Sequence, residues 1–133
     1  MSYDEKQLSQ LLRNLKNRDG LVRSRAASRL GEIKAKEAVE ELARLLKEDR
    51  DSLVRSSAAA ALGDLGEEAQ KAVATLLETI ETDRIVGVRL EAAVALGNIG
   101  SDNAVPGLTK IALEDDDIRV RSWAADALRK IKD

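Results

Sequence analysis

The sequence contains no cysteine, no histidine and no phenylalanine, and it has one proline, one tryptophan and one tyrosine. The lack of cysteine excludes disulfides and thiolate nucleophiles. The lack of histidine removes the commonest general base and a usual ligand of zinc and iron. Catalysis would have to rely on carboxylates, lysines, hydroxyl groups and Tyr3. We therefore expect a protein that is not an enzyme and that holds no metal and no cofactor.

Charge and hydropathy also narrow the possibilities. The 133 residues suit one domain, and 22 basic against 24 acidic side chains give a net charge of -2, which provides no overall attraction for nucleic acid or anionic lipid. The opening MSYDEKQLSQ is not apolar, unlike a secretory signal, and no stretch is apolar enough to cross a membrane. We expect a cytoplasmic protein without membrane attachment.

One phrase occurs four times along the chain, as VRSRAASRLGEIK, VRSSAAAALGDLG, VRLEAAVALGNIG and VRSWAADALRKIK. Its leading valines, Val22, Val54, Val88 and Val120, are 32, 34 and 32 residues apart. A second phrase that begins with Ala-Val follows each of the first three copies. Periods of this length are typical of solenoid proteins.

Both phrases have the period of an amphipathic helix. In the second copy, Val54, Ala58, Leu62 and Leu65 are four, four and three positions apart, which places them on one face of a helix. We call the helix of the Val-Arg phrase the first helix of a repeat and that of the Ala-Val phrase the second helix. The prediction is an all-α fold, an α-solenoid of stacked antiparallel helix pairs with about eight helices.

Paired alanines return at the same phase of every first helix, at positions 26–27, 58–59, 92–93 and 124–125. Small side chains let neighbouring first helices approach closely, so that one helix pair stacks on the next. The pairs therefore predict a continuous packing seam along the array.

The order V-R-x-x-A-A-x-x-L-G-x-I/L-G followed by A-V-x-x-L resembles the HEAT-like repeat of the type first noted in phycobilisome lyase subunits. The resemblance covers residues 19–133. It implies a short right-handed superhelix whose second helices line the concave surface. It also implies a hydrogen-bond ladder between the repeats, which joins Arg23, Arg55, Arg89 and Arg121 to the acids three residues before the valines, Asp19, Asp51 and Asp117. The third copy has Ile85 at this position and offers Asp83 earlier.

The repeat boundaries divide a single domain, 1–133, into unequal units. We expect an N-terminal capping helix in 1–18, repeats at 19–49, 50–83 and 84–116, and a C-terminal capping half-repeat at 117–133. Lys34 occupies the position at which Gly66 and Gly100 end their helices. The first helix of copy one must therefore end differently or hold a lysine in a strained conformation.

Exposed positions of the second helices are the predicted binding surface, because the resemblance places them on the concave side. These protein-binding candidates are Glu40, Glu41, Arg44, Ala74, Thr75, Glu78, Pro106, Gly107 and Lys110. Leu90 and Trp123 are a second candidate, a self-association patch on the outer side, since other copies carry mostly polar residues there. Packing under a neighbouring loop is the alternative for this pair.

We interpret two clusters of charged residues as structural features and not as binding sites. The run EDDD at 114–117 lacks the spacing of a calcium loop, so we interpret it as helix N-terminal charge. The basic residues of 1–30 lack interleaved aromatics and are interpreted as solvated surface, with phosphate contact as the alternative.

The functional prediction is a non-enzymatic scaffold that binds a protein or peptide on its concave face, as a monomer or weak homodimer. An accessory subunit of an enzyme complex similar to the bilin lyase subunits is the first alternative. A weak nucleic-acid binder that uses the basic N-terminal helices is the second, although nucleic acid is not the expected partner.

Overall fold

The structure is a computed structural model that describes residues 3–132. Within this range the chain forms eight α-helices and three short 3-10 helices and contains no strand. In chain order they are α1 (Glu5–Asn14), α2 (Gly20–Glu32), η1 (Lys36–Ala38), α3 (Val39–Glu48), α4 (Ser52–Leu65), η2 (Gly66–Ala72), α5 (Val73–Thr82), α6 (Val86–Ile99), η3 (Asp102–Ala104), α7 (Val105–Glu114) and α8 (Ile118–Lys132). None of the described helices has both the length and the hydropathy of a membrane span.

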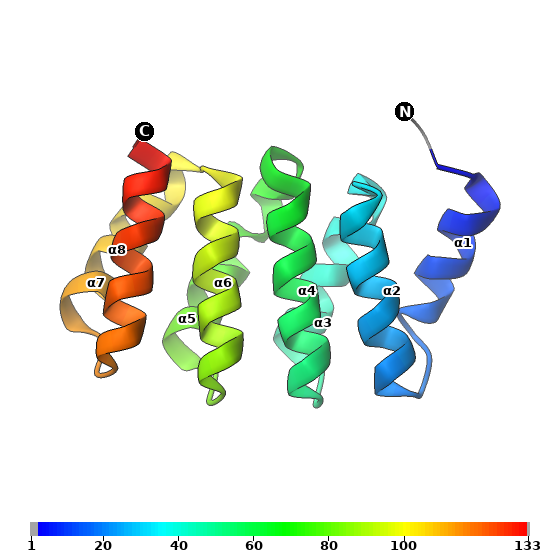
Figure 1. Cartoon of the computed structure of the whole chain (residues 1–133), viewed down its shortest axis with the longest axis horizontal. Coiled ribbons are helices and arrows are strands. Elements are labelled where there is room, and N and C mark those ends of the chain that lie inside the picture. Colours follow the sequence, from blue (N-terminus) through cyan, green and yellow to red (C-terminus); the bar gives the residue numbers. More distant parts are fainter. Residues whose placement is uncertain (1–2, 133) are drawn as a thin grey trace.

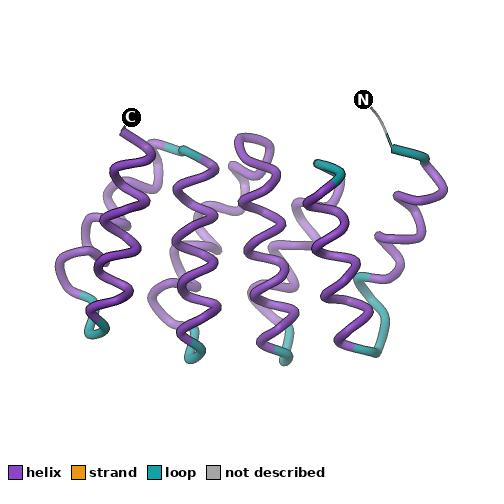
Figure 2. Tube along the Cα trace, viewed as in Figure 1, coloured by secondary structure: helices purple, strands orange, loops and turns teal. Residues whose placement is uncertain are grey.

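The helices are arranged in two layers. The first helices α2, α4, α6 and α8 stand side by side in one layer, and α3, α5 and α7 lie behind them (Figure 1). Short loops and 3-10 turns join successive helices (Figure 2). Helix α1 lies beside α2 at the N-terminal end, where Leu15 is fully buried. The predicted all-α solenoid of stacked helix pairs is confirmed.

The alanine pairs form the seam between the first helices. Both members are buried at 26–27, 58–59 and 92–93, and Ala124 is buried in the last helix. Only Ala125 remains half-exposed. The alanines were therefore correctly interpreted as packing surface.

The residues that flank the first helices have the properties expected of helix caps. The Asp19 and Asp51 carboxylates accept the backbone N–H groups of Leu21 and Leu53 at 2.9 Å and so cap α2 and α4. At the other end of α2, Lys34 has a φ of 58°, which confirms the strained lysine.

Glycines bring the first helices into backbone contact. A Cβ atom on Gly31 would lie 2.8 Å from the Cα atom of Ala61, and one on Gly63 would lie 2.9 Å from that of Ala95. In the second layer the spacing is set by larger groups, since Gly107 of α7 faces the side chain of Leu77. The first helices are therefore the more closely spaced layer.

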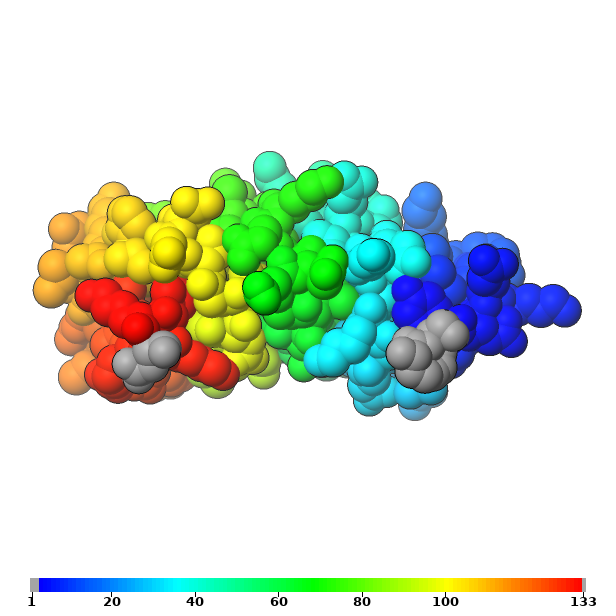
Figure 3. Space-filling view, turned by 90° about the horizontal axis from the view of Figure 1, so that it is seen from above, coloured from blue at the N-terminus to red at the C-terminus, as the bar shows by residue number. Residues whose placement is uncertain are grey.

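This difference in spacing decides which surface is concave. A two-layered array bends toward the layer whose members lie closer together, which here is the layer of α2, α4, α6 and α8. Seen from above, the array runs as one elongated body from its N-terminal to its C-terminal end (Figure 3). The expectation that the second helices line the concave surface is wrong. Glycine and alanine draw the first helices together, whereas leucine side chains hold α5 and α7 apart.

The arginines of the Val-Arg phrase join successive repeats. Arg23 binds both carboxylate oxygens of Asp49 at 2.8 and 3.0 Å, and Arg55 binds those of Asp83 at 2.8 and 3.2 Å. Arg89 pairs with one carboxylate oxygen of Asp115, while its Nε–H donates to the carbonyl of Ile80. These ion pairs are mostly shielded from solvent. The ion pairs lie within single repeats. Between repeats, Arg55, Arg89 and Arg121 donate to the backbone carbonyls of Asp49, Ile80 and Asp115, so the predicted ladder between repeats is formed through carbonyls and not through acids.

The acids that these arginines bind are not the predicted ones. The acidic partners lie five residues before the next valines, at the ends of the second helices, and each pairs with the arginine of its own repeat. Asp19, Asp51 and Asp117, three residues before the valines, instead accept N–H groups in the first turns of their own helices. A carboxylate so close to a helix start reaches the free backbone N–H groups first.

Candidate protein-binding surface

The first helices present one exposed stripe on the concave side, which we call the inner face. Its positions are one residue before and three, six and ten residues after each leading valine, a helical spacing of four, three and four. Twelve of these positions are exposed, and the other four, Ser57, Ala60, Glu91 and Trp123, are half-buried. The inner face comprises Leu21, Arg25, Ser28 and Glu32 of α2, Leu53, Ser57, Ala60 and Asp64 of α4, Gly87, Glu91, Val94 and Asn98 of α6, and Arg119, Trp123, Asp126 and Lys130 of α8.

Several apolar side chains on the inner face are open to solvent, although Leu113 and Ile118, which lie outside it, are more exposed, at 74% and 70%. Leu21, Leu53 and Val94 expose 47%, 51% and 47% of their surface. Trp123 is half-buried and packs in part against the core. Such a concentration of exposed apolar groups on one face of a protein marks a contact surface.

A shallow groove of about 130 Å³ runs between α6 and α8 on this face. Val94 and Trp123 stand among its walls, and its floor consists of Ala93, Gly97 and Ala127. The small residues that allow the two helices to touch also leave this trough above the contact. Its polar residues are Asn98, Asp126 and Lys130.

Both residues of the predicted Leu90 and Trp123 patch belong to the concave layer and not to the outer one, but only Trp123 lies on the inner face, and Leu90 is half-buried and does not line the groove. The hydroxyl groups of Ser24 and Ser57 are 2.6 Å apart. The residue two positions after the leading valine of one first helix therefore faces the residue three positions after the leading valine of the next first helix. The same register places Leu90 beside Trp123. Because both belong to first helices, they lie in the concave layer. The correction follows from the direction of curvature.

Val94 is the groove residue that sequence reasoning missed. It lies one turn after Leu90 on α6 and shares the groove with Trp123. The available signal was its position six residues after the leading valine, where the other copies carry Ser28, Ala60 and Asp126. In the sequence alone, a valine among the aliphatic residues of this helix does not stand out from those of the core.

The predicted second-helix residues lie on the opposite, outer layer. Glu40, Arg44, Ala74, Glu78, Pro106 and Lys110 are exposed, and Glu41, Thr75 and Gly107 are half-buried. Arg44 forms ion pairs with Glu41 and Glu48 of its own helix. The structure does not bring the nine residues into one site. Their role in binding stays a prediction.

Carboxylates beside the groove are poorly neutralised. The pKa of the Glu91 carboxyl is raised above its usual value, first because the group is partly buried and then because Asp64 is negatively charged. Within residues 3–132 neither carboxylate belongs to an ion pair. The inner face is therefore a mixed surface with apolar patches.

The acidic run EDDD is divided among structural roles. Asp115 pairs with Arg89, and Asp117 caps α8 and binds the Arg119 guanidinium, which holds the pKa of Asp117 below its usual range. No group of three carboxylates in the described part of the chain is arranged to hold a metal ion. Asp115 and Asp117 thus act in the turn between α7 and α8.

Comparisons with known proteins agree with this architecture. The family model of HEAT repeats matches residues 5–86 and 68–129. The solved structure of the complex of CpcE and CpcF of phycocyanin lyase from Nostoc sp. PCC7120 is similar, with a TM-score of 0.81 and 24% identity over 92% of this chain and 81% of that one. No curated protein matches the sequence significantly. The two-layered array, the ladder and the family match together show that the chain belongs to the HEAT-repeat family.

Proposed function

We propose that this protein is a non-enzymatic interaction module that binds a partner protein or peptide on its inner face. The observation that carries the proposal is the set of exposed apolar side chains on that face, above all Val94 beside Trp123 in the groove. Tryptophan is enriched among the residues that dominate binding energy. The module works in the cytoplasm in this proposal, consistent with a chain that lacks cysteine.

The shape of the inner face suits a partner of modest size. Its concave curvature surrounds a ligand, and the seryl and alanyl side chains of α4 leave room for one. The ladder and the backbone contacts make the array rigid, so binding orders little of the module itself and loses little entropy.

An accessory role in an enzyme complex is the second candidate. It is supported by the similarity to a structure of two phycocyanin lyase chains in complex. In this version the chemistry belongs to the partner, and this chain positions it. Co-purification of a pigmented complex from the native source would favour this candidate over a general scaffold.

The experiment that tests the proposed function compares the two layers. Tagged wild-type protein captures partners from native lysate in parallel with Val94→Glu, which changes an exposed residue of the groove. The matched control replaces Glu41, Arg44, Glu78 and Lys110 of the outer layer with alanine. We expect Val94→Glu to lose the captured protein and the outer-layer variant to keep it.

Trp123→Ala extends the test, with circular dichroism to show that each variant remains folded. Capture that survives both inner-face changes and disappears with the outer-layer variant would refute the proposal and restore the second helices as the binding surface. Sedimentation of the wild type tests the further prediction of a monomer or weak homodimer.

A further inference from the structure

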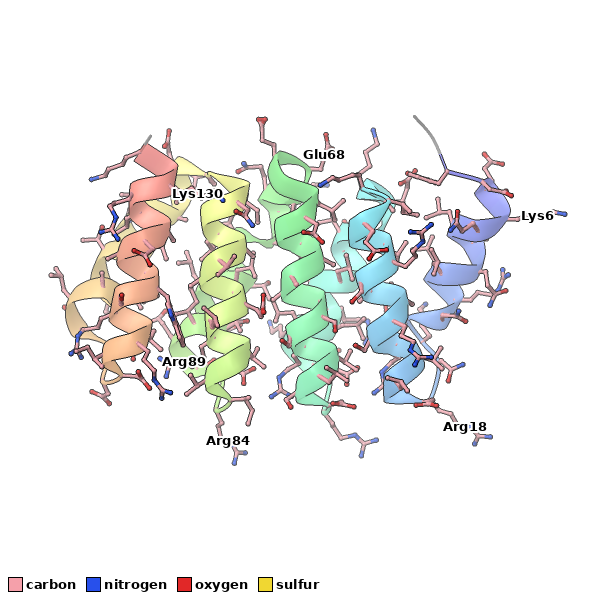
Figure 4. All side chains as sticks on the ribbon, viewed as in Figure 1. Lys6, Arg18, Glu68, Arg84, Arg89 and Lys130 are labelled. Atoms are coloured by element: carbon pink, nitrogen blue, oxygen red, sulfur yellow. The ribbon has the colours of Figure 1, made fainter. Side chains whose placement is uncertain are left out.

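Three arginines form a row along the edge of the array where the first helices begin. Arg18, Arg50 and Arg84 each lie four residues before a leading valine, in the turn that precedes α2, α4 or α6. Arg18 and Arg84 project from the same edge (Figure 4). All three are exposed, and none forms an ion pair or side-chain hydrogen bond with residues 3–132.

Exposed apolar side chains accompany these arginines. Leu21 and Leu53 follow Arg18 and Arg50 by three residues, and Ile85 follows Arg84 directly. They expose 47%, 51% and 45% of their surfaces. Each of the three turns therefore presents one free guanidinium and one open aliphatic side chain. We call the six residues the arginine edge.

The fourth turn interrupts the row with the opposite charge. Asp116 occupies the position that is equivalent to the three arginines, and it is also exposed. The arginine edge is thus confined to α2, α4 and α6. Since packed helices lie about 8–10 Å apart, its guanidinium groups are spaced by a similar distance along about 16–20 Å.

We propose that the arginine edge binds an acidic amphipathic segment of a partner protein. The proposal rests on the proposed function, because Leu21 and Leu53 also belong to the inner face, and it names the chemistry of the partner. Guanidinium groups pair with carboxylates in a bidentate geometry, and the aliphatic side chains accept apolar groups between these pairs. In a helix, carboxylates seven residues apart have a spacing of about 10 Å, which matches the row.

A membrane or a nucleic acid fits this edge less well. The capping carboxylates of Asp19 and Asp51 and the exposed Asp116 interrupt the positive potential that a continuous polyanion would need. The net charge of -2 also opposes long-range attraction of such polymers. Discrete carboxylates on a protein segment can bind each arginine separately.

The test uses the full chain and a labelled helical peptide of about 18 residues that carries glutamates seven positions apart, with leucines three residues after them. Fluorescence anisotropy compares it with the same peptide in which lysine replaces glutamate. We expect the glutamate peptide to bind at least about tenfold more tightly, with an affinity that falls as salt rises.

Charge reversal identifies the site. The variant R18E/R50E/R84E should lose at least about tenfold of the affinity for the glutamate peptide. The matched control K6E/K36E/K71E makes the same change in net charge at three exposed lysines elsewhere and should keep the affinity. Leu53→Ser, which removes an apolar group without changing charge, should weaken binding by a smaller factor.

Several outcomes would overturn the proposal. They are equal losses in the two triple variants, binding of the lysine peptide as strong as that of the glutamate peptide, or no binding of either. Arginine-dependent binding of phosphatidylserine vesicles or single-stranded DNA in place of the peptide would also overturn it. These outcomes would refute the arginine-edge proposal but would not change the result of the capture experiment. Conversely, capture that is insensitive to Val94→Glu and Trp123→Ala would refute the proposed function and leave the peptide result unchanged.

Discussion

At the scale of single residues, Lys34 shows how the repeat tolerates a departure from its pattern. It is the one non-glycine residue with a positive φ in residues 3–132. Its N–H donates to the Gly31 carbonyl at 3.1 Å and that of Ala35 to the Leu30 carbonyl at 3.0 Å, which is the glycine-type ending of a helix. The lysine ammonium also donates to the Asp64 carbonyl at 2.6 Å and so joins the ends of α2 and α4.

Lys34→Gly should stabilise the protein by about 0.5 to 1 kcal/mol. The strain of a residue with a Cβ atom in the left-handed conformation is larger than the stabilisation from the hydrogen bond of the lysine ammonium. Urea unfolding monitored by circular dichroism measures the change. Lys34→Ala is the matched control, since it keeps the strain and loses the hydrogen bond, and it should be destabilising. A gain of stability in the alanine variant would show that backbone strain is not the cause.

Glu91 is a residue whose charge costs stability. Its raised pKa means that the folded state binds the proton more tightly than the unfolded state, so this contribution to stability is present at low pH and is lost as pH rises through the folded pKa. Glu91→Gln should therefore raise the stability at pH 7 by up to about 0.5 kcal/mol. The gain should shrink when the thermal unfolding is repeated near pH 4. An equal gain at both pH values would contradict this explanation.

At the scale of the helix, glycines determine how closely the first helices approach. The space around each glycine differs. An added Cβ would meet backbone at Gly31 and Gly63, would have a looser contact of 3.3 Å with the Cα atom of Ala127 at Gly97, and would meet nothing within 4 Å at Gly87. The tightest contacts thus lie between α2 and α4 and between α4 and α6.

This order predicts a graded series of alanine substitutions. Gly63→Ala should destabilise the protein by about 1 to 3 kcal/mol, because two backbones must separate. Gly97→Ala should cost less. Gly87→Ala should be neutral or stabilise by up to about 1 kcal/mol, because alanine favours the helix and no atom obstructs it. Chemical denaturation of the three variants gives the ranking, and a loss at Gly87 as large as that at Gly63 would exclude steric contact as the cause.

At the scale of the whole molecule, the arginine ladder links repeats that otherwise meet through aliphatic side chains. In addition to its carboxylate, Arg23 donates to the carbonyl of Asn17 at 2.8 Å, and Arg55 donates to that of Asp49 at 2.9 Å. Each of these two arginines therefore holds the turn before its own helix and the turn before the next one. The ladder fixes the position of successive repeats relative to one another.

The first rung makes the stability of the array sensitive to acid. Burial alone would raise the pKa of Asp49, but hydrogen bonds from Arg23 and from the N–H of Asp51 lower it below the usual value. A depressed folded pKa gives stability that is present above the unfolded pKa and is lost as pH falls through the folded pKa. The wild type should therefore lose stability below about pH 4.

Asp49→Asn tests this rung. It should cost about 1 to 3 kcal/mol at pH 7, because Arg23 loses its charged partner, and it should flatten the loss of stability between pH 5 and pH 2. Urea unfolding over this pH range is the measurement. Asp102→Asn, at an exposed residue without an ion pair, should change stability at pH 7 by less than about 0.5 kcal/mol. A pH profile of Asp49→Asn parallel to that of the wild type would exclude Asp49 as the titrating group.

Much of the fold follows from the sequence by itself. The recurrence of the Val-Arg phrase in a helical period determined the helix pairs, their number and their stacking, because no other arrangement buries these apolar stripes. The alanine pairs identified the seam for the same reason. The arginines of the ladder could also be predicted. Their acidic partners could not, because Asp49 and Asp51 lie two residues apart and the sequence does not show which of them binds the arginine and which caps the helix.

The tertiary structure alone decided where a partner could bind. Curvature depends on the spacing of one helix layer relative to the other, and this difference emerges only when Gly63 packs on Ala95 and Gly107 on Leu77. The same packing opened the groove beside Trp123, because the small residues of its floor, Ala93, Gly97 and Ala127, are also those that let α6 and α8 approach closely. A linear pattern records which residues are small, but the hollow surface they create depends on the distance between helices.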